Sequence, residues 1–321
     1  MFTHAYSPDD PRQWCVSADD LIALRTQVVT GFNHGRYDSP FAGLHRTHRR
    51  GRGMDYREAR HYQAGDDLRN MDWRITARTG RPHVKVFDEE RERPVMVVVD
   101  CGAGMFFASR GAFKMVLAAR LAALFGWSAI AHGDRIGAAL LSDPPLELPP
   151  RGGRSGQMRL IRALVAAGEP TIGLHNPPNP AALPQALARL LRVARPGSQV
   201  ILLSDFHHLT ADVGQTLQRL ARHTDLRAVQ LIDPLELKPP PPGQYAIRTA
   251  AGGGIIDTHS RVARQRYVAQ LQQAQARLET LMAQSGVALV RVLTSDDAVS
   301  AFAQLARATP RRPLLHVNNL S

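Results

Sequence analysis

The chain has 321 residues, of which 44% are hydrophobic, so it can bury a substantial core in one or two domains and is not an intrinsically disordered protein. It contains 40 Lys and Arg against 28 Asp and Glu, which gives a formal net charge of +12 and favours acidic partners, membranes or nucleic acid. Only three of the basic residues are lysine, and the two cysteines, Cys15 and Cys101, are too few for a disulfide framework.

The amino terminus lacks the basic region and apolar core of a signal peptide. No apolar run reaches the length of about 18 residues that a bilayer requires. The most apolar segment, residues 116–130, contains Arg120 and several alanines. We therefore expect a core helix in that segment, no membrane span, and a cytoplasmic protein.

Residues 1–93 are expected to form an N-terminal unit made of a helix and a β-rich segment. Asp19 and Asp20 can cap a helix over residues 21–30. A basic, glycine-punctuated turn follows at residues 44–53. Short apolar patterns separated by turn residues then predict three strands, at residues 56–62, 70–77 and 82–87.

Between residues 94 and 310 strands and helices alternate, which is typical of a parallel sheet with helices on both faces. The strands are expected at residues 94–100, 134–141, 146–148, 199–204, 226–233 and 287–293. The helices are expected at residues 111–131, 155–166, 181–193, 262–282 and 296–306, with a loop at 170–180, a hairpin turning around 252–254 and a tail at 311–321. The predicted fold class is α/β, with a doubly wound, mostly parallel sheet and a small β-rich N-terminal unit.

Two of the expected strands lead into aspartates. Residues 94–100 are apolar up to Asp100, as in a strand buried on both faces, and Asp205 follows the strand at 199–204. Ligands of open α/β sheets bind outside the carboxyl ends of the strands. If the two strands are neighbours, the carboxylates face one cleft and could hold a divalent cation. Alternatively, Asp205 caps the next helix and Asp100 orders its own loop.

The alternation of strands and helices, the Asp100 loop and Asp205 together resemble a von Willebrand factor A domain. The metal-ion-dependent adhesion site of that family uses Asp-x-Ser-x-Ser after the first strand, a threonine before a later helix and an aspartate after the fourth strand. Asp100 and Asp205 match the aspartates, whereas Gly102 and Gly104 replace the serines and Ala181 replaces the threonine. The resemblance implies this fold and a degenerate site, with no cofactor or only weakly bound Mg²⁺.

Residues 60–80, called the hallmark segment below, are dense in arginine, aspartate and glycine. The arginines can pair with the aspartates, a glycine permits a positive φ in a turn, and a tryptophan supplies apolar area. We interpret the segment as a structural turn held by ion pairs, or as a partner-docking surface, in preference to a catalytic site. The residues concerned are Arg60, Tyr62, Gly65, Asp66, Asp67, Arg69, Asp72, Trp73 and Arg78.

The order of these residues resembles the signature of a bacterial family, domain of unknown function fifty-eight: Arg-x-Tyr-x-x-Gly-Asp-Asp-x-Arg-x-Met-Asp-Trp, then Ala-Arg. Residues 51–53, 87–90 and 133–137 also fit, so the resemblance spans residues 51–205. Members carry this signature before a von Willebrand factor A-like domain. They are typically encoded beside MoxR-type AAA+ ATPases and are thought to act with them in chaperone-like assembly or metal insertion. The resemblance therefore implies such an ATPase and its client protein as partners.

Two functions of other classes are alternatives. Asp100, Asp205 and His207 could form a metal-dependent hydrolase site, although no His-x-x-x-His pattern accompanies them. The basic run at residues 45–52 could bind nucleic-acid phosphates, although it has no interleaved aromatic residues. We favour neither, and predict a non-enzymatic interaction protein that binds a MoxR-type ATPase.

Overall fold

A computed structural model describes residues 10–28, 54–63, 66–89, 93–175, 179–207, 209, 213–249, 252–307 and 315–316. They form a large unit, to which residues from Arg93 onward belong, and a small unit within Arg36–Glu92. The hallmark segment lies in the small unit and both candidate aspartates lie in the large one.

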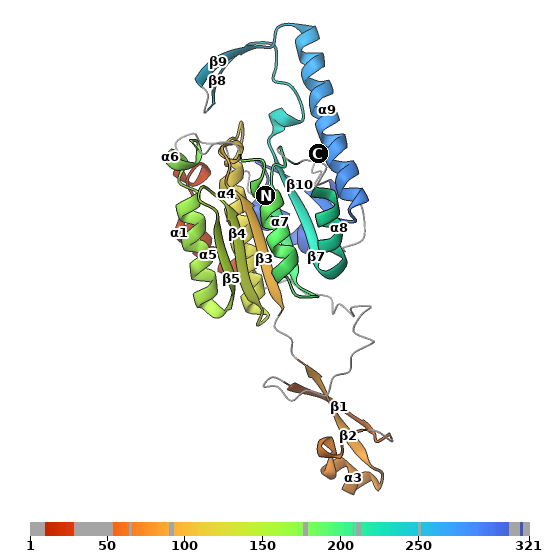
Figure 1. Cartoon of the computed structure of the whole chain (residues 1–321). Helices are drawn as coiled ribbons and strands as arrows, with labels where there is room; N and C mark the ends of the chain where they lie inside the picture. The colour runs from red at the N-terminus through yellow and green to blue at the C-terminus, as the bar shows by residue number, and fades with distance from the viewer. Residues whose placement is uncertain are drawn as a thin grey trace. The chain divides into compact units, whose positions relative to one another are not determined.

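The large unit is built on a seven-stranded sheet in the order β11-β10-β7-β6-β3-β4-β5 (Figure 1). Every neighbouring pair is parallel except β4 and β5, which are antiparallel. This confirms the predicted doubly wound, mostly parallel sheet. The strands are β3 (Pro94–Asp100), β4 (Arg135–Leu141), β5 (Leu146–Gly152), β6 (Gln199–Ser204), β7 (Asp225–Ile232), β10 (Ala288–Leu293) and β11 (Leu315–His316).

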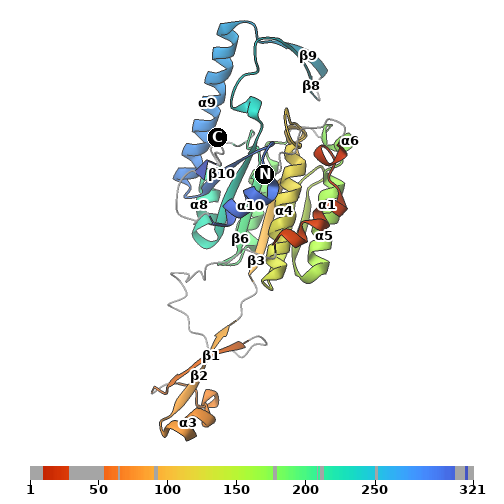
Figure 2. The same ribbon diagram turned by 180° about the vertical axis from the view of Figure 1, so that it is seen from behind.

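Helices cover both faces of this sheet and enclose two separate hydrophobic cores (Figures 1 and 2). The central strands are buried on both sides, which explains their unbroken apolar sequences. One face is covered by α1 (Ala18–Ala23), α2 (Arg25–Val28), α4 (Lys114–Ala131), α5 (Gly153–Ala167) and α10 (Ala298–Arg307). The other face is covered by α7 (Ala182–Val193), α8 (Val213–His223) and the C-terminal part of α9 (Arg261–Gln284).

Helix α4 is the predicted core helix. It is the one described helix that is long and apolar enough to cross a membrane, and 83% of that stretch is buried inside the fold. Arg120, its one interior cation, reaches the surface and donates to the carbonyl oxygen of Arg12 at 2.8 Å. The apolar side chains of α4 therefore pack in the core of the large unit.

In the small unit, the described residues include an antiparallel strand pair, β1 (Met54–His61) with β2 (His83–Glu89). The prediction of a strand at residues 70–77 was wrong, because a 3-10 helix, η2 (Leu68–Asn70), and an α-helix, α3 (Trp73–Thr79), lie there. The Asp72 carboxylate accepts from the backbone amides of Arg74 and Ile75, and Gly80 ends the helix with φ +68°. A capping aspartate and a left-handed glycine outweighed the apolar alternation that suggested a strand.

The domain boundaries differ from the predicted ones at both ends of the chain. The N-terminal helix belongs to the large unit, because Leu21 of α1 is buried in its core and accepts a hydrogen bond from Trp127 Nε1 at 2.9 Å. Part of the expected C-terminal tail also belongs to this unit, because β11 pairs with β10. The basic run at residues 45–52 lies outside the described residues.

Smaller elements complete the description. The predicted loop at residues 170–180 begins with a short helix, α6 (Pro170–Gly173). The predicted hairpin consists of β8 (Gln244–Thr249) and β9 (Gly252–Asp257), but it turns before Gly252, and the glycines at 252–254 pair within the ladder. The remaining 3-10 helices are η1 (Pro11–Gln13), η3 (Ala103–Met105) and η4 (Pro234–Glu236).

Candidate functional site

Asp100 and Asp205 lie at the carboxyl edge of the sheet, at the centre of its strand order. Strands β3 and β6 are parallel neighbours with Val99 opposite Leu203, so Asp100 is level with Ser204 and Asp205 lies one residue beyond it at the same edge. The chain adds β4 and β5 on one side of β3, and β6, β7 and β10 on the other. This is the switch point at which doubly wound sheets bind ligands.

The Asp100 carboxylate orders its own loop. Its Oδ1 accepts from the Gly102 amide at 2.9 Å, and its Oδ2 accepts from the Ser204 hydroxyl at 2.6 Å. The Ser204 oxygen in turn accepts from the Phe206 amide at 2.9 Å. Asp100 thus orders the loop that follows β3 and also ties the end of β3 to the end of β6.

Asp205 belongs to a compact group of charged side chains that we call the edge cluster: Lys114, Asp205, His207 and Glu236. Lys114, the first residue of α4, has a side chain only 1% exposed. Its ammonium lies 2.6 Å from Glu236 Oε1 and 3.5 Å from Asp205 Oδ2. His207 closes the group, with Nδ1 3.2 Å from Asp205 Oδ2 and Nε2 3.8 Å from Glu236 Oε1.

The environment of the edge cluster keeps Asp205 ionised. Burial alone would raise the pKa of its carboxyl, but the hydrogen bond from His207 and the charge of Lys114 lower that pKa well below its usual range. The hydrogen bond to Asp205 likewise raises the pKa of His207, against the opposing effect of burial. The cluster is therefore a network of compensated charges.

A second buried carboxylate, Asp233 at the end of β7, fastens the surrounding loops. It accepts from the Ser109 amide at 2.7 Å and hydroxyl at 2.5 Å, from the Thr294 hydroxyl at 2.8 Å and from the Leu235 amide at 2.9 Å. Its own amide donates to Glu236 Oε2 at 2.8 Å. Glu236 therefore joins the Asp233 loop to the edge cluster.

The residues at this edge do not fit the divalent cation that the resemblance to von Willebrand factor A domains implies. A side chain at Gly104 would bring its Cβ within 2.7 Å of Asp205 Oδ2, so no serine can be accommodated there without movement. An ammonium already lies against Asp205. Within the described part of the chain, no three His, Cys, Asp or Glu side chains are arranged to hold a metal ion. The same geometry gives no support to a hydrolase built on Asp100, Asp205 and His207.

The hallmark segment uses its acidic residues to shape the backbone. Asp66 forms a two-pronged ion pair with Arg60, at 2.9 and 2.7 Å, and accepts from the Gln63 amide. Asp67 caps η2 by accepting from the Arg69 amide at 2.9 Å. Asp72, buried and capping α3, completes this set.

The remaining hallmark residues have different positions. Tyr62 donates its amide to the Pro82 carbonyl at 2.9 Å, which closes the end of the strand pair. Gly65 lies outside the described residues. Arg69 and Arg78 are exposed, and among the described residues no ion pair joins them to Asp67 or Asp72. The expected pairing of these two arginines with the aspartates is therefore absent there, and Arg60–Asp66 is the pair that forms. Trp73, the first residue of α3, is 69% exposed.

Comparison with known proteins identifies the family. The sequence model described as "Protein of unknown function DUF58" matches residues 58–277, which is more than half of the chain. The chain belongs to this family.

The curated relatives and the solved structures to which this DUF58 protein is similar share at most 29% of its residues over the aligned region. The "Uncharacterized protein Rv1480" of Mycobacterium tuberculosis and "Uncharacterized protein Mb1516" of Mycobacterium bovis are each 29% identical over 248 residues, which cover 77% of this chain and 74% of theirs. The hypothetical protein BatB from Bacteroides thetaiotaomicron is 14% identical with a TM-score of 0.39, and covers 66% of this chain and 96% of its own. A von Willebrand factor type A protein from Catenulispora acidiphila is 12% identical with a TM-score of 0.38, and covers 70% and 43%.

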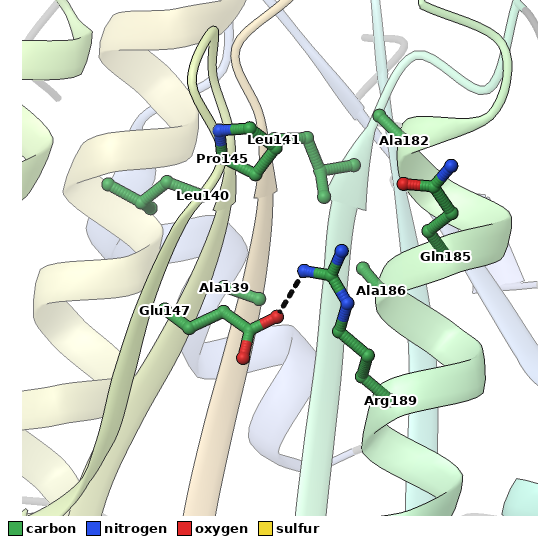
Figure 3. A pocket seen from close by; sticks show the side chains of 9 residues that line it. All are labelled: Ala139, Leu140, Leu141, Pro145, Glu147, Ala182, Gln185, Ala186 and Arg189. Carbon is green, nitrogen blue, oxygen red and sulfur yellow. Dashed lines mark hydrogen bonds and ion pairs between the residues drawn. The ribbon is translucent and has the colours of Figure 1, made fainter.

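A pocket on the sheet edge of the DUF58 protein is too small for a ligand. It lies between β4, β5 and α7, where Glu147 and Arg189 reach across it to form a 2.6 Å ion pair (Figure 3). Its volume is about 10 Å³. That is the space of a single water molecule, so this pocket offers no substrate site.

Sequence reasoning missed the basic and second acidic members of the edge cluster. Lys114 and Glu236 lie 122 positions apart and meet only through the fold. A signal for Lys114 was present, because this chain uses lysine at only three of its 40 basic positions and one of them begins its most apolar helix. A lone cation at the first turn of a buried helix needs an acidic partner.

Proposed function

We propose that this DUF58 protein is a non-enzymatic interaction protein that docks on a MoxR-type AAA+ ATPase and acts with it in chaperone-like assembly of a client protein. The observation that carries the proposal is the exposure of Trp73 at the start of α3. The small unit supplies the docking surface, and the large unit supplies the scaffold.

The surroundings of Trp73 support a docking role. Its neighbour in the segment, Leu68, is 59% exposed, so two large apolar side chains face solvent on elements whose caps are made by Asp67 and Asp72. An exposed tryptophan on a capped helix loses little conformational freedom on binding, and tryptophan is among the residues that contribute most at protein interfaces. By capping η2 and α3, Asp67 and Asp72 fix the backbone that carries these two exposed side chains.

The chemistry of the large unit supports a non-catalytic role. Both carboxylates at the switch point are engaged, Asp100 by Ser204 and Asp205 by Lys114 and His207. The thiol beside them, Cys101, is buried, and burial raises its pKa, so it is not a nucleophile at neutral pH. The choice of a MoxR-type ATPase as partner comes from the resemblance of the hallmark segment to its family.

The test is a binding measurement between the full chain and a purified MoxR-type ATPase from the same organism. Because truncation of an interface tryptophan typically costs about 2 kcal/mol or more, Trp73→Ala should weaken binding by roughly thirtyfold or more. Since this side chain is mostly exposed, the variant should keep the thermal unfolding temperature of the wild type.

Val193→Ala is the matched control, because Val193 is 70% exposed on α7 of the large unit. It should bind the ATPase as the wild type does. An affinity that is unchanged by Trp73→Ala and by a Leu68→Ala, Trp73→Ala double variant would rule out this docking surface.

A further inference from the structure

The edge cluster contains a cation of its own. The Lys114 ammonium is buried between carboxylates that come from two different loops, Asp205 after β6 and Glu236 in η4. Burying a lone ammonium is strongly unfavourable, and it is tolerated where carboxylates neutralise it. The reverse also holds, because Asp205 and Glu236 would repel each other without the ammonium. Cation and anions at this edge therefore depend on one another.

We propose that Lys114 is a built-in replacement for a metal ion at the carboxyl edge of the sheet. Its ammonium supplies the positive charge that a divalent cation would supply between the loops after β6 and β7. The edge therefore keeps its structure without metal. Removal of the ammonium leaves the Asp205 and Glu236 carboxylates without their counter-charge, so we expect a divalent cation added in solution to take its place beside them.

The identity of the basic residue fits this role. Lysine carries a compact charge on a flexible stem, whereas the flat guanidinium of arginine is larger and requires a planar set of acceptors. The carboxylates of Asp205 and Glu236 approach the ammonium separately, at 3.5 and 2.6 Å. This chain uses arginine at nearly all its basic positions, and it has lysine where a small cation is enclosed.

The loop after β3 fits the same interpretation. Gly104 brings its backbone so close to Asp205 that a Cβ there would lie 2.7 Å from Oδ2. The space beside Oδ2 is therefore too small for the hydroxyl side chain that would be needed there to ligate a metal. Lys114 then approaches from the start of α4, and the charge is enclosed.

The experiment compares Mn²⁺ binding by the full-length wild type and by Lys114→Ala, after EDTA has been removed, with calorimetry and thermal unfolding. Mn²⁺ is the probe because it accepts both carboxylate and imidazole ligands. The wild type should bind no Mn²⁺ below about 1 mM, and its unfolding temperature should not respond to the ion. Lys114→Ala should unfold at a lower temperature, bind one Mn²⁺ at least tenfold more tightly than the wild type, and recover stability when Mn²⁺ is added.

Lys238→Ala is the matched control, because Lys238 is another of the three lysines, lies two residues after Glu236 and is exposed. It should behave as the wild type does in both measurements. Adding Asp205→Asn to Lys114→Ala should abolish the acquired Mn²⁺ binding, which assigns the ion to the edge cluster.

Two results would overturn the proposal. One is stoichiometric, micromolar Mn²⁺ binding by the wild type that Asp205→Asn removes, because the ammonium would then not occupy the site of the ion. The other is a folded Lys114→Ala variant that neither binds Mn²⁺ nor is stabilised by it. If Lys114→Ala does not fold in EDTA, it is refolded from denaturant with Mn²⁺: recovery of the native circular dichroism spectrum supports the proposal, and failure to recover contradicts it.

Discussion

The buried carboxylates of Asp205 and Asp233 come directly after the adjacent strands β6 and β7 and are stabilised in different ways. Asp205 is compensated by charge, from Lys114 and His207. Asp233 is fully buried and is stabilised by hydrogen bonds from two hydroxyls and two backbone amides. The charges around Asp205 hold the edge cluster together. The Asp233 carboxylate joins three loops of the large unit, those that contain Ser109, Leu235 and Thr294.

Replacing Asp233 with alanine should destabilise the large unit by about 3 kcal/mol, because it leaves the buried Thr294 hydroxyl and the half-buried Ser109 donors without their acceptor. Urea unfolding followed by circular dichroism measures this loss. Glu147→Ala is a suitable control, since Glu147 takes part in an exposed ion pair with Arg189 and should cost at most about 1 kcal/mol. Equal unfolding midpoints for the two variants would contradict the role given to Asp233.

The Cys101 thiol should be inert in the folded protein. Burial raises its pKa first, and the neighbouring charge of Asp100 raises it further, so the reactive thiolate is not formed. We expect iodoacetamide to leave Cys101 unmodified at about pH 9, where an ordinary thiol is largely ionised, and to modify it after unfolding in guanidinium. Peptide mapping by mass spectrometry separates Cys101 from Cys15. Modification of Cys101 in the native protein would show that this part of the core opens.

Among the elements, α3 depends most clearly on its ends. It has seven residues, a length at which a helix gains little from its own hydrogen bonds. The Asp72 cap at its start and the left-handed Gly80 at its end therefore contribute much of its stability. Because α3 begins with Trp73, these ends also determine how that side chain is presented.

Asp72→Ala should destabilise α3 by about 1 kcal/mol, which raises the rate of hydrogen exchange of its backbone amides roughly fivefold. Asp72→Asn keeps an acceptor at the cap and should have a much smaller effect. Exchange measured by mass spectrometry on peptides covering residues 73–80 makes the comparison, with α7 peptides as an internal reference. Equal protection in both variants would mean that packing against β2, and not the cap, holds the helix.

The sequence predictions were mostly accurate for features that depend on residues close together in the chain, and they failed for contacts between residues far apart in it. Strands β3 and β6 were predictable, because burial on both faces selects unbroken apolar residues such as Val97 and Leu202. Helix α3 was predicted as a strand because its segment is too short to show a helical repeat of apolar residues. Asp72 and Gly80 nevertheless indicated a helix, since an aspartate often begins a helix and a glycine often ends one. The carboxylates of the site were found from their position after apolar strands. Glu236 and Lys114 were not, because only the folded sheet brings a residue of η4 to the start of α4.

For the molecule as a whole, none of the described residues of the small unit belongs to the two hydrophobic cores of the large unit. Replacement of Arg36–Glu92 by a flexible Gly/Ser linker of about 20 residues should therefore leave the large unit folded, with one cooperative thermal transition. Circular dichroism and calorimetry measure this. The same variant should lose binding to the ATPase under the proposed function. A broad transition without a native near-ultraviolet spectrum would contradict the independence of the large unit.

Helix α4 has a consequence for synthesis on the ribosome. When Ala131 has emerged, α1, α2 and β3 have already been made, but β6, β7 and α10, which also pack against α4, are still to be translated. By length and composition alone, this segment is apolar enough to cross a membrane, and in the folded protein most of it is buried. We therefore expect the partly made chain to expose apolar surface of α4 until the remaining strands of the sheet have been made.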